Sequence, residues 1–359
     1  MNQQLSGANA HALTHGMSNE WPPAVAWYAV IGVIFAVMGF WAMGQWMFSA
    51  DFHPAPLGAH PDPIPGYVIP LIRTVEIGNV LGFIWVIYFC HKCNQREGRL
   101  SLETALMLGW ALQYWTDPTI QWIRPMFFYN AYFINMQNWS SFIPGWVNPT
   151  SHGYPSPLLY QGLTYFFYFL IVTLMISWVM RQAKRLRPHW GPVRLIAVGI
   201  VFSILWDLLM ELIWIRTHLY AYPNAIYSLS VWGGTVYQFP IYEAIFWGMV
   251  NGATGVLYYF RDDRGNTIVD RGLERIKSVR MRGPIRVLAI SGFISIPFWI
   301  YIAVMVLFSL HGDPMPKGYP SWLVNGACGA GTSLPCPGPN SVIAPFTEIK
   351  PSSDPYSNP

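Results

Sequence analysis

The chain has 359 residues, of which 53% are hydrophobic, 16% aromatic and 11% charged. A soluble domain carries about a quarter charged residues, so the composition excludes an ordinary soluble globular protein. The formal net charge of +4 says little until the positions of the basic residues are considered.

Seven stretches are long and apolar enough to predict transmembrane helices. They lie at 24–48, 68–90, 101–118, 158–181, 194–216, 240–260 and 285–310. The third is the weakest, because it is short and ends at Asp117-Pro118. Residues 1–20 hold no Lys or Arg and so lack the basic region of a cleaved signal peptide. We therefore predict an all-α, multi-pass helix bundle over residues 24–311 in the plasma membrane.

Basic residues gather after the second, fourth and sixth stretches. They are Lys92, Arg96 and Arg99, then Arg181, Lys184, Arg185, Arg187 and Arg194, then Arg261, Arg264, Arg271, Arg275, Lys277, Arg280, Arg282 and Arg286. Positively charged connections stay in the cytoplasm. We expect these three connections inside, and both the N-terminal segment 1–23 and the tail 312–359 outside. The rule explains the charge without a nucleic-acid partner, and anionic membrane lipids are the expected contacts.

The connections on the other side are rich in aromatic residues. Segment 119–157 contains IQWIRPMFFYNAYFINMQNWSSFIPGWVNP, and a connection of this length is usually functional. Aromatic residues also anchor proteins at the membrane surface, so a lid and an interfacial anchor both remain open. The tail from Gly312 is rich in Pro, Gly and Ser, and we expect it to be poorly ordered.

The four cysteines fall on both sides of the membrane. Cys328 and Cys336 lie in the outer tail, where a disulfide can persist, and whether they form one is left open. Cys90 and Cys93 form a CHKC motif. Structural zinc needs four ligands, so two reduced thiols at a helix end are the favoured interpretation.

Acidic side chains inside the predicted helices are the strongest functional signal, because charge is costly there. Asp207 and Glu211, in WDLLMELIW, are four residues apart and share one helix face. Glu76, Asp117 and Glu243 are the other three. With a rise of about 1.5 Å per residue, all but Asp207 fall in the outer half of the membrane. We predict one acidic pocket that opens outward beneath the aromatic connections.

The predicted chemistry depends most on Asp207 and Glu211. Side chains at this spacing lie about 5–6 Å apart, and two like charges that close cannot both ionise cheaply in a low dielectric. One carboxylic acid beside one carboxylate is the equipment of general acid–base catalysis.

Structural explanations remain open for the other acids. Glu76 could pair with Arg73 as a structural ion pair, Asp117 could end a helix beside Pro118, and Glu243 could lie at the interface. Polar and aromatic residues on the same helix faces would shape the pocket and bind substrate. These are Arg73, Asn79, Tyr114, Trp214, Trp247, Asn251 and, more weakly, His218.

Several cofactor signatures are missing from the sequence. The predicted helices hold no paired histidines for haem or di-iron, and there is no phosphate-binding loop or GxSxG elbow. We therefore expect no metal and no cofactor, and acid–base chemistry on a lipophilic small molecule. The alternative is a proton-coupled transporter or binder of such a molecule, but transporters usually show two related halves, and none is detectable. A scaffold protein would have no use for buried acids.

Four segments resemble the AveC-like spirocyclase family. They are YWTDPTIQW (114–122), FFYNAYFINMQNWSSFIPGW (127–146), WDLLMELIW (206–214) and FPIYEAIFWG (239–248). The family consists of actinobacterial multi-span membrane proteins named for the avermectin-pathway enzyme that closes a spiroketal. The resemblance implies a cyclase or dehydratase of secondary metabolism acting on a polyketide- or terpenoid-like substrate, and it identifies neither the substrate nor the catalytic residues. On this interpretation Asp207 and Glu211 form the acid–base pair, with Glu243, Asp117 and Glu76 as supporting or alternative acids.

Overall fold

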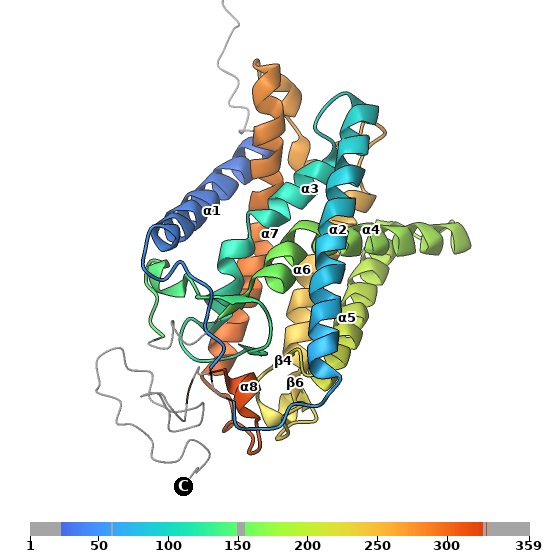
Figure 1. Cartoon of the computed structure of the whole chain (residues 1–359). Helices are drawn as coiled ribbons and strands as arrows, with labels where there is room; N and C mark the ends of the chain where they lie inside the picture. The colour runs from blue at the N-terminus through green and yellow to red at the C-terminus, as the bar shows by residue number, and fades with distance from the viewer. Residues whose placement is uncertain (1–22, 59, 149–154, 326–327, 329–359) are drawn as a thin grey trace, which may run out of the picture.

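The computed structural model describes residues 23–58, 60–148, 155–325 and 328, and it is dominated by long helices (Figure 1). The long helices are α1 (Ala24–Met47), α2 (Val68–Glu97), α4 (Leu163–Leu186), α5 (Pro192–Arg216), α6 (Ile241–Tyr259) and α7 (Val279–Ser309). The shorter helical segments are α3 (Leu102–Ala111), η1 (Tyr114–Gln121), η2 (Ser140–Phe142), η4 (Leu158–Gly162), η5 (Tyr227–Leu229), η6 (Ile268–Asp270), η7 (Leu273–Arg275) and α8 (Ser321–Val324). This architecture confirms the predicted all-α bundle.

The strands form small antiparallel ribbons near one end of the bundle. They are β1 (Phe128–Tyr129) with β4 (Tyr220–Ala221), β2 (Asn135–Met136) with β3 (Ser156–Pro157), and β5 (Ser230–Val231) with β6 (Phe239–Pro240). We call this the ribbon end. Figure 1 shows β4, β6 and α8 at the bottom of the bundle, whereas α2 ends and α7 begins at the top, which we call the basic end.

Five helical segments are long and apolar enough to cross a bilayer, which indicates a membrane protein. They are Ala24–Met47, Val68–Glu97, Leu158–Leu186, Pro192–Arg216 and Val279–Ser309. Their outward faces carry large apolar side chains, such as Phe40, which is 68% exposed, and Leu81, which is 62% exposed. Surfaces of this kind suit lipid rather than water.

The third predicted stretch, 101–118, is a broken helix rather than one continuous helix. Ser101 caps α3, which has ten residues and is therefore about 15 Å long, and the 3-10 helix η1 follows. Together they still join the two ends of the bundle, because Leu100 accepts a hydrogen bond from Arg286 near the start of α7, and Arg124 donates to Ser309 at its end. Irregular backbone at membrane depth is tolerated where protein covers it, and most of α3 is buried.

The start of α1 lies at the basic end, contrary to our expectation. The Val25 amide donates to the Arg271 carbonyl at 3.1 Å, which places Ala24 beside the basic connection that joins α6 to α7. A segment that contacts this connection cannot lie on the opposite face of the membrane, so the expectations of an outside N-terminus and of an inside connection between α6 and α7 do not fit this packing together.

The beginning of the predicted tail is folded rather than poorly ordered. Residues 312–325 pack against the ribbon end, where α8 buries Trp322 and the Ser321 amide donates to Asp62 at 2.7 Å. Cys328 is disulfide-bonded, and Cys336, its candidate partner, lies outside the described residues. Cys90 and Cys93 are free and buried.

Helices α5 and α6 approach closely enough to bring their acids together. A Cβ atom on Gly248 of α6 would lie 2.6 Å from the Cα atom of Ile204 on α5, so only glycine fits this contact. One turn from Gly248 toward the ribbon end, α6 presents Glu243 in its first turn, and α5 presents Asp207 and Glu211 on its buried face.

Candidate functional site

A cavity of about 90 Å³ lies inside the bundle near the ribbon end. It is lined by four carboxyl groups, seven phenols and several large apolar rings. The carboxyl groups are Asp117, Asp207, Glu211 and Glu243; the phenols are Tyr129, Tyr160, Tyr165, Tyr168, Tyr220, Tyr222 and Tyr301; and the rings include Phe127, Phe169, Trp214, Trp247 and Phe298. We call it the acid cavity.

Three of the carboxyl groups form a cluster between α5 and α6. Asp207, Glu211 and Glu243 are each less than 9% exposed. The carboxyl groups of Asp207 and Glu243 lie close enough to interact, and two carboxyl groups can hydrogen-bond to each other only when one of them carries a proton. Glu211 accepts hydrogen bonds from Tyr220 at 2.6 Å and Tyr222 at 3.2 Å.

Glu243 has one further partner, and parts of the cluster have none. The hydroxyl of Tyr301 on α7 donates to Glu243 Oε1 at 3.3 Å. Asp207 Oδ2 and Glu243 Oε2 are buried without a conventional donor among the described residues. The cluster therefore contains buried acceptor atoms without a donor in the described part of the chain, in the lining of a cavity that a ligand or water can fill.

Asp117 forms a second hydrogen-bonded group in the same cavity. Its Oδ1 atom accepts from Gln161 at 2.6 Å and Tyr165 at 3.5 Å, and its Oδ2 atom accepts from Tyr129 at 3.5 Å. Asp117 lies in η1, which runs through Pro118, so it does not simply end α3. Gln161 lies in η4, a single π-helical turn before α4, and such turns are frequent at functional sites.

Glu76 lies outside the lining of the acid cavity. It forms an ion pair with Arg73 and accepts the Ile134 amide at 2.7 Å, while Arg73 donates to the Tyr132 carbonyl at 2.7 Å. This pair therefore fastens α2 to the 128–136 segment. The contacts of Arg73 and Glu76 therefore fit a structural ion pair better than a role in the pocket.

The predicted substrate-binding residues divide in the same way. Trp214 and Trp247 line the acid cavity. Asn79 instead donates to the Tyr160 carbonyl at 2.9 Å, and Tyr114 packs against Trp139 and Tyr165 behind the wall. Asn251 is buried one turn beyond Trp247, outside the lining.

His218 also lies outside the lining, at the ribbon end. Its ring hydrogen-bonds to the Tyr67 hydroxyl at 2.9 Å, and its backbone has a φ of 64°. Burial, and then the charge of Arg216, lower the pKa of His218. These contacts join α2 to the end of α5.

The phenols and Gln161 are the lining residues that sequence reasoning missed. Tyr220 and Tyr222 alternate in sequence and belong to or follow β4, so both rings can point into the cavity. Tyr165 and Tyr168 share one face of α4. These spacings are visible in the sequence. Tyrosine is common at membrane interfaces, however, so the prediction of the pocket relied on the acidic residues.

The comparisons with known proteins identify a family and nothing closer. The spirocyclase AveC-like family model matches residues 97–325, which includes all four cavity carboxyl groups. Searches of curated proteins and of solved structures found no match. The chain belongs to the AveC-like spirocyclase family.

Proposed function

We propose that this protein is a membrane-embedded, cofactor-free cyclase that uses acid–base chemistry to close a ketal ring on an apolar polyketide- or terpenoid-like substrate. One observation carries the proposal: four buried carboxyl groups line a single aromatic-walled cavity. Within the described residues, none of the four forms an ion pair with Lys or Arg. Buried acids without a cation are poor structural elements and good proton donors and acceptors.

The chemistry requires a proton to be given at one oxygen and taken at another. A hydroxyl of a dihydroxyketone adds to its carbonyl carbon, giving a hemiketal. A carboxylic acid protonates the hemiketal hydroxyl, the C–O bond breaks, and water leaves an oxocarbenium ion. The second hydroxyl then attacks this carbon, and a carboxylate takes its proton, so the ring closes with loss of one water overall.

The contacts support distinct roles within the cluster. Asp207 and Glu243 lie against each other without a cation among the described residues, so a proton held between them would make this pair the acid. Glu211 accepts two phenolic hydrogen bonds, which stabilise a carboxylate, so it would act as the base and would stabilise the cation. Asp117, with Gln161, would hold a second oxygen of the substrate.

The walls would control conformation and water. Trp214, Trp247 and Phe298 line the same cavity as the carboxyl groups, and a folded substrate chain packed against these rings would bring its hydroxyl groups near the carbonyl. Excluding bulk water favours ring closure over capture of the oxocarbenium ion by water.

The cavity must widen to accept such a substrate. At about 90 Å³ it is well below the roughly 300–1,000 Å³ of sites for drug-sized ligands. Tyr129 and Tyr220 roof it from the β1–β4 ribbon, which has only two residue pairs. We propose that this ribbon opens to admit substrate.

We also propose an orientation in the plasma membrane. The basic end, with the connections after α2 and α6, would face the cytoplasm by the positive-inside rule. The start of α1 then lies inside, and the acid cavity opens toward the outer face.

The test is conversion of a defined substrate by the purified protein in lipid nanodiscs. A panel of long-chain dihydroxyketones is incubated with wild-type protein and with Asp207→Asn, and products are followed by mass spectrometry. We expect loss of one water and a single spiroketal stereoisomer with wild type only. A racemic product formed at the rate of the protein-free control would refute cyclase activity.

The same panel separates the transporter alternative. In proteoliposomes, a proton-coupled transporter would move an unmodified lipophilic compound across the bilayer in response to a pH gradient. Gradient-driven accumulation without chemical conversion would replace the cyclase proposal by the transporter.

A further inference from the structure

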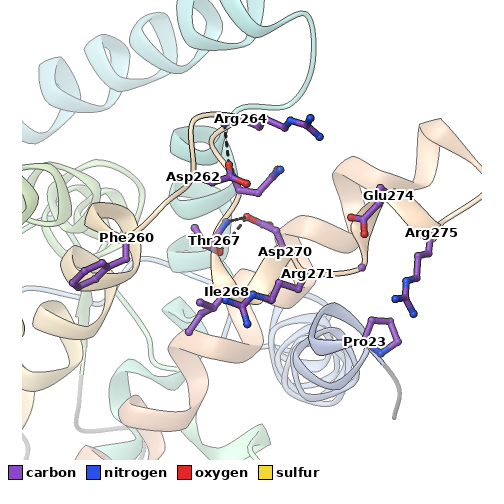
Figure 2. A pocket seen from close by; sticks show the side chains of 12 residues that line it. Pro23, Phe260, Asp262, Arg264, Thr267, Ile268, Asp270, Arg271, Glu274 and Arg275 are labelled. Atoms are coloured by element: carbon purple, nitrogen blue, oxygen red, sulfur yellow. Dashed lines mark hydrogen bonds between the residues drawn. The ribbon is translucent and has the colours of Figure 1, made fainter. Parts of the chain in front are cut away.

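A second and larger pocket, of about 750 Å³, lies at the basic end (Figure 2) and shares no lining residue with the acid cavity. The connection between α6 and α7 forms most of it, and Pro23, at the start of α1, closes one side. Arg264, Arg271 and Arg275 are among its lining residues. We call it the arginine pocket.

The floor of this pocket is held by a buried ion pair. Arg286 binds Asp270 at 3.1 Å, and both side chains are at most 2% exposed. Asp270 also accepts from the amide and hydroxyl of Thr267, and Arg286 donates to the Leu100 and Gly265 carbonyls. The connection is therefore fixed to α7 and to the chain before α3. The shape of the pocket is thus held by specific side-chain contacts.

The charges in the pocket are not equally available to a ligand. Asp270 is neutralised by Arg286, and Asp262 accepts the amides of Arg264 and Asn266 at 2.9 and 2.8 Å. The side chain of Arg271 is exposed and makes no hydrogen bond or ion pair within the described part of the chain. Among the acids, only Glu274 is exposed without a role in holding the loop.

The rim of the pocket is apolar on one side. Phe260 and Ile268 line it and are 39% and 47% exposed, and Val279 and Met281, just beyond, are 71% and 49% exposed. The pocket lies where α6 ends and α7 begins, and α7 is long and apolar enough to cross a bilayer. A ligand with a polar head and an apolar tail matches this arrangement of charged and apolar residues. A soluble anion would contact only the charged residues.

We propose that the arginine pocket binds the head group of an anionic phospholipid whose head group carries hydroxyls. The exposed fork of Arg271 suits bidentate binding of the phosphate oxygens, and Arg275 adds a second positive charge to the same lining. Glu274 repels phosphate but accepts hydrogen bonds from a polyol, which explains an acid among the arginines. The acyl chains would run along the apolar rim beside α1 and α7.

The test is lipid binding by the full-length protein, counted by native mass spectrometry in detergent. Phosphatidylglycerol and phosphatidylcholine are added separately, and glycerol 1-phosphate is the soluble probe with the same head group. We expect phosphatidylglycerol to bind at least about tenfold more tightly than phosphatidylcholine, and Arg271→Gln/Arg275→Gln to abolish this preference. The matched control is Arg187→Gln/Arg194→Gln, which removes the same charge from exposed positions elsewhere and should keep the preference.

Three outcomes would overturn the proposal. They are equal binding of the two lipids, loss of the preference in both double variants, and binding of glycerol 1-phosphate as tight as that of the lipid. The last would assign the pocket to a soluble phosphate ester. None of these measurements uses turnover, so they stand apart from the proposed cyclase activity.

Discussion

Buried acids at the two ends of this bundle have opposite surroundings. Asp270, at the basic end, is 2% exposed and lies against Arg286 and Thr267. Asp207 and Glu243, near the ribbon end, are almost as buried, but they contact each other and no cation among the described residues.

The difference separates structural charges from chemical ones. A carboxylate that is ion-paired and saturated with donors keeps its charge and holds two segments together. A carboxyl group that shares a proton with its neighbour can give or take that proton with little rearrangement. Burial alone therefore does not mark a functional acid in this protein, and the partners of each acid do.

The largest expected effect is on turnover in the acid cavity. Asp207→Asn and Glu211→Gln should each lower the rate of ring closure by about 10²–10⁴-fold, the usual contribution of a general acid or base. Neither should lower the unfolding temperature, because each removes a buried carboxyl group that has no cation. Rates are measured on the dihydroxyketone panel. A loss of less than about threefold in both variants would contradict a chemical role for these two acids.

The reverse result is expected at the basic end. Asp270→Asn leaves Arg286 buried without its counter-charge, which typically costs about 3–5 kcal/mol. We expect a lower unfolding temperature by scanning fluorimetry, with the turnover of the molecules that remain folded close to that of wild type. Exposed Asp263→Asn is the control and should change neither quantity.

A smaller effect is expected from the phenols that bind Glu211. Tyr220→Phe or Tyr222→Phe removes one hydrogen bond to a charged acceptor, worth about 1.5–3 kcal/mol, and so should lower turnover by roughly 10–100-fold. Tyr258→Phe, whose hydroxyl donates to the Glu103 carboxyl group at 2.5 Å outside the lining of the acid cavity, serves as control. Equal losses in all three variants would indicate a packing effect instead.

Glu76→Gln tests whether the Arg73–Glu76 ion pair, which holds the 128–136 segment against α2, has only a structural role. The substitution keeps an acceptor for the Ile134 amide but removes the ion pair with Arg73, which is 44% exposed, so the loss of stability should be only about 0.2–1 kcal/mol. Turnover should stay within about threefold of wild type. A loss comparable to that of Glu211→Gln would return Glu76 to the catalytic residues.

The smallest expected effect is a pH dependence at His218. Its pKa in the folded protein lies below the ordinary value of 6.5, so the unfolded chain takes up a proton first as the pH falls. Stability should be constant above about pH 6.5 and decrease below it, until the lowered folded pKa is passed. His218→Gln should show a shallower decrease of unfolding temperature between pH 6.5 and 5, and parallel curves would exclude this contribution.

The sequence predicted the bundle and all four carboxyl groups of the cavity, together with Glu76, which lies outside the lining. Asp207 and Glu211 could be placed on one face from their spacing alone. Of the three basic connections predicted to share a side, those after α2 and α6 contact each other through Arg99 and Asn266. These inferences succeed because helical periodicity and membrane charge rules act locally.

The sequence could not predict which face of α2 points toward the cavity, or the break between α3 and η1. Glu76 shares a face with Arg73, and only the packing of the 128–136 segment shows that this face lies behind the wall of the cavity. The 3-10 helix around Asp117 is stable because α7 and α1 cover it, so its shape depends on distant segments. The Asp207–Glu243 contact likewise depends on how closely Gly248 lets α5 and α6 approach.

The central claim is that the acid cavity performs acid–base ring closure, and the double variant Asp207→Asn/Glu211→Gln tests it most directly. Turnover and unfolding temperature are measured on the same nanodisc preparation, beside wild type. The proposed pair predicts turnover at the protein-free background, with an unfolding temperature equal to or above that of wild type. Stereoselective ring closure by the double variant at the wild-type rate would contradict it.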